Sequence, residues 1–136
     1  MPPKTIDFDA PNLAAEIEQL SLNEIDHLPF GVILLDREGT VLFYSKTEAR
    51  LSGYGKIPIG RNWYELSICM ANDEFQGRIA RAMEKGPVDL EFGWTGDYND
   101  PKRDLRFRIQ SSSSAEGIWI FIERDNGDGP QGTAKR

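Results

Sequence analysis

The chain has 136 residues and a mass of 15.4 kDa, and its 39% hydrophobic and 28% charged residues are typical of one globular domain. A formal net charge of −6 argues against binding of nucleic acid through a basic surface. The sequence contains neither an apolar run of the roughly 20 residues that span a bilayer nor a recognisable secretory signal. We therefore expect no membrane partner, a cytoplasmic location, and a monomer or weak dimer.

The first 28 residues predict a helical cap. Leu13 and Ile17 recur at helical spacing, and Ser21 and Glu24 have the spacing of a capping box, in which each side chain satisfies a free backbone amide of the other. Short helices depend on tertiary contacts for stability. We therefore expect residues 1–28 to pack across the main fold.

From Phe30 onward the pattern alternates between short strands and helices. The runs GVILLD and VLFYS flank Gly39, which can supply the positive φ that a tight hairpin turn requires. Helical segments follow, and three further strands close the domain. The expected later elements are a helix at Thr47–Leu51, a helical turn at Asn62–Leu66, a helix from Asp73 to a stop at Gly86, and strands around Val88–Trp94, Leu105–Ile109 and Gly117–Arg124.

This order of elements predicts an α+β fold, with a five-stranded antiparallel sheet and helices gathered on one side. It resembles the PAS domain, a fold widely used for sensing that commonly holds a small ligand between its sheet and its helices. Residues 29–125 form the expected PAS core. Residues 126–136 are polar and rich in glycine, so we expect them to form a disordered tail. A fold alone does not settle function.

The sequence contains the strings DHLPFG, LLDREGTVLFYSKTE, IGRNWYEL followed by SIC, DEFQGRI and FGWTGDYND, which together resemble strings of the photoactive yellow protein family. They occur in the same order as in that family, with only short gaps, and cover roughly Asp26 to Arg124. Tyr44, Glu48 and the single cysteine, Cys69, match the three residues that hold the family's chromophore.

The resemblance implies that p-coumaric acid is held as a thioester on Cys69. Cys69 lies in a loop between a helical turn and the next helix, where a thiol could face a pocket. A thioester needs one accessible sulfur as its nucleophile. The alternative is an inert buried thiol, which is common for a free cysteine.

Tyr44 ends the second strand and Glu48 follows four residues later, so their side chains could converge on one point of a pocket. Both could donate a hydrogen bond to a phenolate, Glu48 only if it is protonated. Burial and a nearby phenolate both raise the pKa of a carboxylic acid, so we expect a neutral Glu48. The alternatives are a core tyrosine and a solvated helix residue near Lys46. Ser52 matches a threonine of the family and could supply a hydroxyl to Tyr44.

The outer shell of the expected pocket departs from the family pattern. Tyr54 stands where the family's type member has an arginine, Asp100 where it has a methionine that assists thermal recovery, and Gly96 where it has a phenylalanine. Trp94 is a candidate for the pocket wall, although it is equally an ordinary core or sheet-face aromatic. These changes lead us to expect slower dark recovery than in the type member.

The resemblance implies a blue-light photoreceptor that turns over no substrate. Light would isomerise the chromophore from trans to cis, and Glu48 would give up its proton. An unpaired buried carboxylate costs several kcal/mol, a large share of the ~5–15 kcal/mol stability of a small domain. We expect this cost to loosen the N-terminal cap, whose exposed surface would bind an unidentified downstream signalling protein.

Other functions remain open at this point. The chief rival is a non-photoactive PAS sensory or interaction module in which Cys69 is structural, and a third possibility is a minor enzyme with Cys69 as its nucleophile. His27 is the only histidine, which excludes a multi-histidine metal site and leaves a hydrolytic Cys69–His27 pair or haem ligation without supporting context. The Gly-x-Asn-Cys-Arg string of flavin-binding photoreceptors is absent around Cys69.

Overall fold

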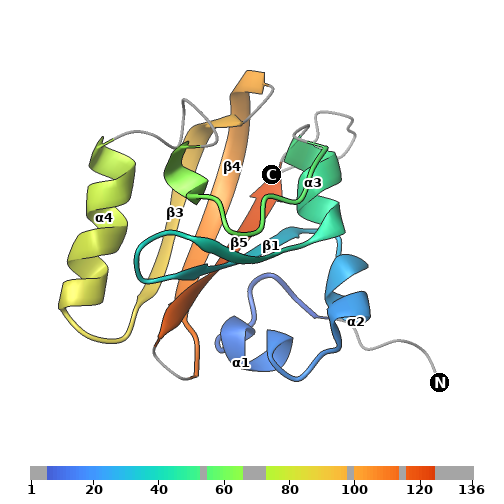
Figure 1. Ribbon diagram of the computed structural model, residues 1–136, viewed down its shortest axis with the longest axis horizontal. Coiled ribbons are helices and arrows are strands. Elements are labelled where there is room, and N and C mark those ends of the chain that lie inside the picture. Colours follow the sequence, from blue (N-terminus) through green and yellow to red (C-terminus); the bar gives the residue numbers. More distant parts are fainter. Residues whose placement is uncertain (1–5, 53–54, 66–72, 98–99, 114–115, 125–136) are drawn as a thin grey trace.

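The computed structural model describes residues 6–52, 55–65, 73–97, 100–113 and 116–124. Five strands form one antiparallel sheet in the order β2-β1-β5-β4-β3 (Figure 1). This is the α+β architecture that the sequence predicts. The elements are α1 (Leu13–Ile17), α2 (Leu22–Asp26), β1 (Gly31–Asp36), β2 (Val41–Tyr44), α3 (Lys46–Ser52), the 3-10 turn η1 (Trp63–Glu65), α4 (Asp73–Glu84), β3 (Asp89–Asp97), β4 (Asp100–Ser111) and β5 (Gly117–Arg124).

The sheet is buried on both faces. Alternate residues of a strand point to opposite sides, so the same strands contribute side chains to two cores. One face packs with α3, η1 and α4 around a core that includes Ile33, Phe107 and Ile120. The other face packs with the N-terminal segment, which contributes Leu13 and Ile17 to a second core. Residues of α1 and α2 therefore pack on the face of the sheet opposite to α4, and the end of α2 adjoins the start of α3 (Figure 1).

The two N-terminal helices form as their sequence predicts. Leu13 and Ile17 of α1 are fully buried. At the start of α2, the Ser21 hydroxyl accepts from the backbone amide of Glu24 at 3.1 Å, and the Glu24 carboxylate accepts from the amide of Ser21 at 2.8 Å. The predicted capping box is therefore confirmed, and it satisfies two amides at the beginning of α2.

The hairpin between β1 and β2 turns at Gly39, which has a φ of 94°. A Cβ atom at this position would lie 2.7 Å from the ring of Tyr64, so the turn needs glycine for space as well as for conformation. η1 lies against this turn, since the amide of Trp63 donates to the Gly39 carbonyl at 2.9 Å. Burial raises the pKa of the Tyr64 hydroxyl to about 12.

α4 covers the β3 and β4 side of the sheet (Figure 1). Its apolar stripe follows the predicted spacing, with Phe75 and Ile79 fully buried. Gly86, with a φ of 121°, follows the helix in the way that the sequence predicts. Within the described ranges, the helices are too short and too polar to cross a membrane. The expected disordered tail, residues 126–136, lies outside the described residues.

Candidate functional site

The first turn of α3 is fastened at several points, and this positions Glu48. The Ser45 hydroxyl caps the helix by accepting from the amide of Glu48 at 3.1 Å, and it also accepts from the amide of Val32 at 3.1 Å. The Thr47 hydroxyl donates to the carbonyls of Asp26 and Leu28, both at 2.9 Å. These bonds hold α3 to β1 and to the end of α2, so the Glu48 side chain starts from a fixed backbone.

The Glu48 carboxylate forms a buried ion pair with Arg124, the last residue of β5. The Arg124 Nη1 and Nη2 atoms donate to the two carboxylate oxygens at 2.7 and 2.8 Å. Each side chain is only 3% exposed. Two parallel charge-assisted hydrogen bonds of this length are the strongest arrangement available to a carboxylate and a guanidinium. This pair differs from the expectation that an ionised Glu48 is an unpaired buried charge.

Gly31 provides the space that the Glu48 carboxylate occupies. A Cβ atom built on Gly31 would lie 1.9 Å from Oε1 of Glu48 and 2.9 Å from its Cδ. Gly31 pairs with Ile122 across β1 and β5, and Arg124 lies two residues beyond Ile122 on the same face of the sheet. The Glu48 carboxylate therefore lies against the backbone of Gly31 and the guanidinium of Arg124.

Tyr44 lies on the same face of the sheet as the Glu48 carboxylate. It pairs with Ile33, which is two residues from Gly31 along β1, and is 4% exposed within the core on that face. Ser52, at the end of α3, is 2% exposed. Tyr44, Glu48 and Ser52 are thus three buried polar side chains at β2 and α3.

The remaining residues of the expected site are only partly described. Cys69 and Tyr54 lie outside the described residues. Gly96 lies near the end of β3 and Asp100 begins β4, and only the backbone is described at these positions. His27 is exposed, and its Nδ1 lies 2.7 Å from the Asn23 carbonyl of its own helix.

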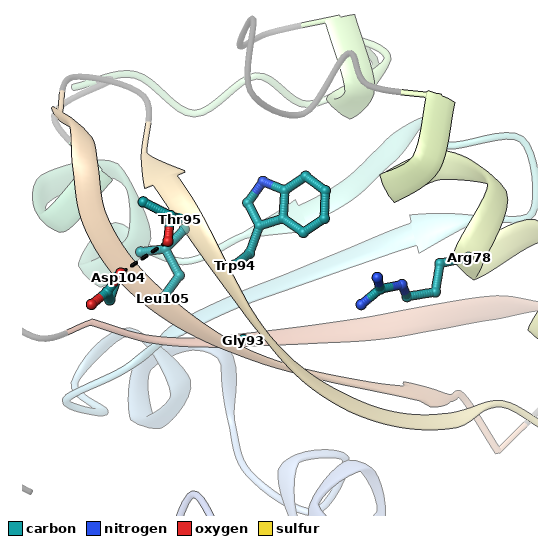
Figure 2. A pocket seen from close by; sticks show the side chains of 6 residues that line it. All are labelled: Arg78, Gly93, Trp94, Thr95, Asp104 and Leu105. Carbon is teal, nitrogen blue, oxygen red and sulfur yellow. Dashed lines mark hydrogen bonds between the residues drawn. The ribbon is translucent and has the colours of Figure 1, made fainter.

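Trp94 lines an open hollow at the edge of the sheet (Figure 2). The hollow has a volume of about 520 Å³, and Tyr44, Glu48 and Ser52 are not among its lining residues. The Trp94 ring also packs edge-on against Phe75, with 5.0 Å between the ring centroids. The hollow is lined by Arg78, Gly93, Trp94, Thr95, Asp104 and Leu105.

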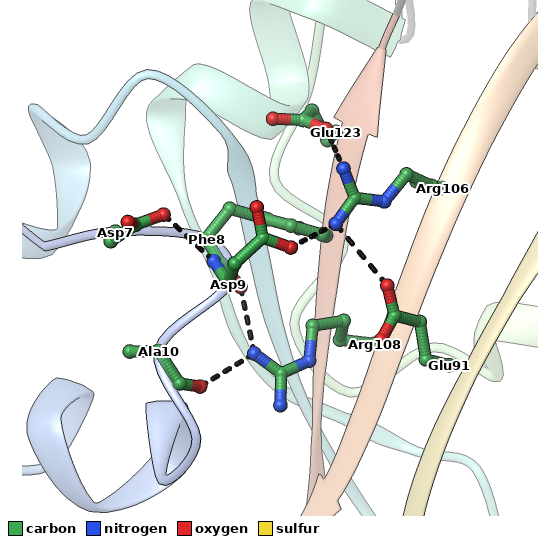
Figure 3. Close-up of polar contacts among 8 residues, drawn as sticks. All are labelled: Asp7, Phe8, Asp9, Ala10, Glu91, Arg106, Arg108 and Glu123. Atoms are coloured by element: carbon green, nitrogen blue, oxygen red, sulfur yellow. Dashed lines mark hydrogen bonds and ion pairs between the residues drawn. The ribbon is translucent and has the colours of Figure 1, made fainter.

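Two arginines of β4 reach the N-terminal segment on the opposite face (Figure 3). Arg108 is 6% exposed and donates to the carbonyls of Phe8 and Ala10 at 2.8 and 2.6 Å. Arg106 pairs with Asp9, and also with Glu123 at 2.8 Å. Because Arg108 is buried and binds backbone carbonyls, it fixes the backbone of the N-terminal segment against β4.

Further contacts extend this attachment to α1. Gln110 accepts from the amide of Ala14 at 2.7 Å and donates to the carbonyl of Pro11 at 3.1 Å. The indole of Trp119 donates to the Glu18 carboxylate at 2.8 Å. Burial raises the pKa of Glu18, but hydrogen bonds from Trp119 and Ser113 outweigh it, so the pKa lies below its ordinary value.

Sequence reasoning missed two residues of the site. Arg124 ends the predicted strand GIWIFIER, and the alternation of side chains along a strand places it on the same face as Ile120 and Ile122. That alternation is the signal that could have found it. Gly31 carried no such signal, because its role depends on a side chain from α3, 17 positions later in the chain.

Comparisons with known proteins agree with this architecture, although no protein-family model matches the chain. The chain is 30% identical over 103 residues to the photoactive yellow protein of Rhodothalassium salexigens, covering 74% of this chain and 82% of that protein. The crystal structure of the photoactive yellow protein domain of the sensor histidine kinase Ppr from Rhodospirillum centenum matches with a TM-score of 0.67 and 31% identity, covering 79% of this chain and 96% of that one. The PAS domain of a protein from Colwellia psychrerythraea matches with a TM-score of 0.59 and 15% identity over 79% and 96% of the two chains, a likeness that shows the fold alone. The predicted PAS fold is confirmed.

Proposed function

Because this chain belongs to the photoactive yellow protein family, we propose that it is a blue-light photoreceptor with p-coumaric acid held as a thioester on Cys69. The observation that supports this most is that Tyr44 of β2 and Glu48 of α3 are both buried on the same face of the sheet. A buried hydroxyl and a buried carboxyl are chemically suited to hold a phenolate oxygen away from water. The protein would act as a sensor and not as an enzyme.

The polar residues of the described site fit such a chromophore. Tyr44 and Glu48 are the proposed hydrogen-bond donors to the phenolate, and Ser52 is a proposed supporting hydroxyl. Gly31 leaves room for the Glu48 carboxyl group at this position, since any larger residue would collide with it. Tyr54, Trp94, Gly96 and Asp100 remain proposed outer residues that tune colour and recovery.

When bound, the chromophore would supply absorption of blue light and a trans-to-cis isomerisation. Glu48 is the residue proposed to release a proton in the light-driven cycle. The carboxylate that remains has Arg124 within hydrogen-bond distance, so its charge is compensated inside the protein. The energy available to loosen other parts of the fold is therefore smaller than an unpaired carboxylate would provide.

We propose that the signal is a loosening of the N-terminal cap, residues 1–28, against the PAS core, residues 29–125. The cap is held by its apolar contacts with the sheet and by hydrogen bonds that Arg108 and Gln110 donate to its backbone carbonyls. Such edge segments open at lower free energy than the central strands. The opened surface would bind a downstream signalling protein in the cytoplasm.

The attachment is tested by incubating the apoprotein with an activated p-coumaroyl donor. We expect the intact mass to rise by one coumaroyl group and a visible absorption band to appear. Cys69→Ser is a clean control, because Cys69 is the only cysteine in the sequence. A wild-type protein that gains no cysteine-dependent adduct would contradict the proposal and favour a PAS module in which Cys69 is structural.

The role of Glu48 is tested separately in the loaded protein. Glu48→Gln keeps the size of the side chain but removes its acidic proton, so we expect the visible band to shift and the photocycle to change. The matched control is Glu24→Gln, because Glu24 is exposed in the capping box of α2, far along the chain from Tyr44 and Cys69. If Glu48→Gln left the visible spectrum unchanged, Glu48 would not be a hydrogen-bond donor to the phenolate.

A further inference from the structure

The ion pair between Glu48 and Arg124 lies where the proposed function requires a neutral proton donor. A guanidinium has donors and no acceptor, so both carboxyl oxygens of Glu48 act as acceptors in this pair. This is the hydrogen-bonding pattern of an ionised carboxylate. A lone carboxylate as deeply buried would favour its neutral form, whereas a neighbouring opposite charge favours the ionised form.

We propose that Arg124 is a positioning residue that holds Glu48 as a carboxylate in the chromophore-free protein. Glu48 then becomes a hydrogen-bond donor only when it takes up a proton and gives up part of its bonding to Arg124. This inference rests on the proposed function, because it concerns how the same Glu48 is made ready to hold a phenolate.

The surroundings of α3 single out Arg124 for this role. Among the described residues, two other charged side chains contact α3 from outside: Asp26 accepts from the backbone amide of Lys46 at 2.8 Å, and Arg103 donates to the carbonyl of Leu51 at 2.8 Å. Both therefore bind the backbone of the helix. Arg124 binds the Glu48 carboxylate itself, and Tyr44 is the titratable side chain that β2 places on the same face.

The sheet fixes the position of Arg124 relative to Glu48. Leu105 and Arg124 pair across β4 and β5, so the backbone of Arg124 is held within the sheet. Gly31 on the adjacent strand keeps the space for the carboxylate open. The strands β1, β4 and β5 and the helix α3 therefore together position the buried ion pair of Glu48 and Arg124.

The test is a pH titration of the apoprotein carrying ¹³C-labelled glutamate, followed by NMR. Glu48→Gln assigns the Glu48 side-chain resonance by its loss. We expect Glu48 to be ionised at neutral pH in the wild type, and its titration midpoint to rise by roughly 1–3 pH units in Arg124→Gln, because the compensating charge is removed. A wild-type Glu48 that is protonated at neutral pH would overturn the proposal, and this outcome does not depend on the folding of an Arg124 variant.

Two further variants separate the charge of Arg124 from its shape and from general effects. Arg124→Lys keeps the positive charge and should retain a midpoint closer to the wild type than Arg124→Gln does. Arg108→Gln removes an equally buried arginine that contacts backbone carbonyls on the opposite face, so it should leave Glu48 unchanged. Equal shifts in Arg124→Gln and Arg108→Gln would refute the proposal. The titration uses no chromophore, so its result stands apart from the adduct test.

Discussion

Replacing Gly31 with alanine tests whether the space for the Glu48 carboxylate is essential. The added methyl group would lie 1.9 Å from Oε1, 2.9 Å from Cδ and 3.2 Å from Cβ of Glu48. Neither the β1 backbone nor the first turn of α3 can easily retreat, because Gly31 is paired with Ile122 and α3 is fastened to β1 through Ser45. The carboxylate must therefore move away from Arg124.

The expected cost follows from the burial of the pair. Separating a buried ion pair costs about 3–5 kcal/mol, and alanine in a strand regains about 0.5–1 kcal/mol relative to glycine, so we expect Gly31→Ala to lower the free energy of unfolding by about 2–4.5 kcal/mol. In Gly93→Ala of β3, the new methyl group would meet its nearest neighbour, the Leu105 carbonyl, at an ordinary 3.8 Å. That variant should be as stable as the wild type or slightly more stable.

Urea unfolding followed by circular dichroism measures both variants, provided that the dependence of the free energy on urea is unchanged. A double-mutant cycle with Glu48→Ala isolates the contact, since Gly31→Ala should cost less than about 1 kcal/mol once the carboxylate is gone. Equal stability of Gly31→Ala and the wild type would refute the reasoning, as would an equal cost in the presence and absence of Glu48.

Two further predictions concern Tyr64 and the cap. Burial raises the pKa of Tyr64 to about 12 in the folded protein, so the unfolded chain loses this proton first, and the free energy of unfolding should fall between about pH 10 and 12. Tyr64→Phe should flatten that part of the curve, and an unchanged slope would contradict the assignment. Arg108→Met removes charged hydrogen bonds worth about 1.5–3 kcal/mol, so limited proteolysis within the cap should be roughly tenfold faster or more. Arg106→Met, in which a more exposed arginine is lost, should have a smaller effect, and equal rates in the two variants would show that the cap does not depend on Arg108.

Local patterns were sufficient for the elements of the fold. The capping box of Ser21 and Glu24, the turn at Gly39 and the stripe of Phe75 and Ile79 each depend on residues close in the chain, and each is confirmed. The strand expected at Gly117–Arg124 is confirmed as β5, and its continuous apolar run is buried from Gly117 to Ile122.

The pairing of Glu48 with Arg124 could not be predicted in the same way. The expectation of a neutral side chain considered burial and a phenolate, but not the charge that β5 brings from 76 positions along the chain. Sequence spacing does not show which distant side chains meet, and the sign of an electrostatic effect depends on that meeting.

The sequence by itself determined the α+β order of elements and the family resemblance, and it supplied Tyr44, Glu48 and Cys69 as candidates, because these depend on local pattern and residue type. Only the tertiary structure decided that the Glu48 carboxylate pairs with Arg124 beside Gly31, and that Arg108 binds backbone carbonyls of the cap. The physical reason is that the charge state of a buried group is set by the few atoms around it, and here those atoms come from strands far apart in the chain.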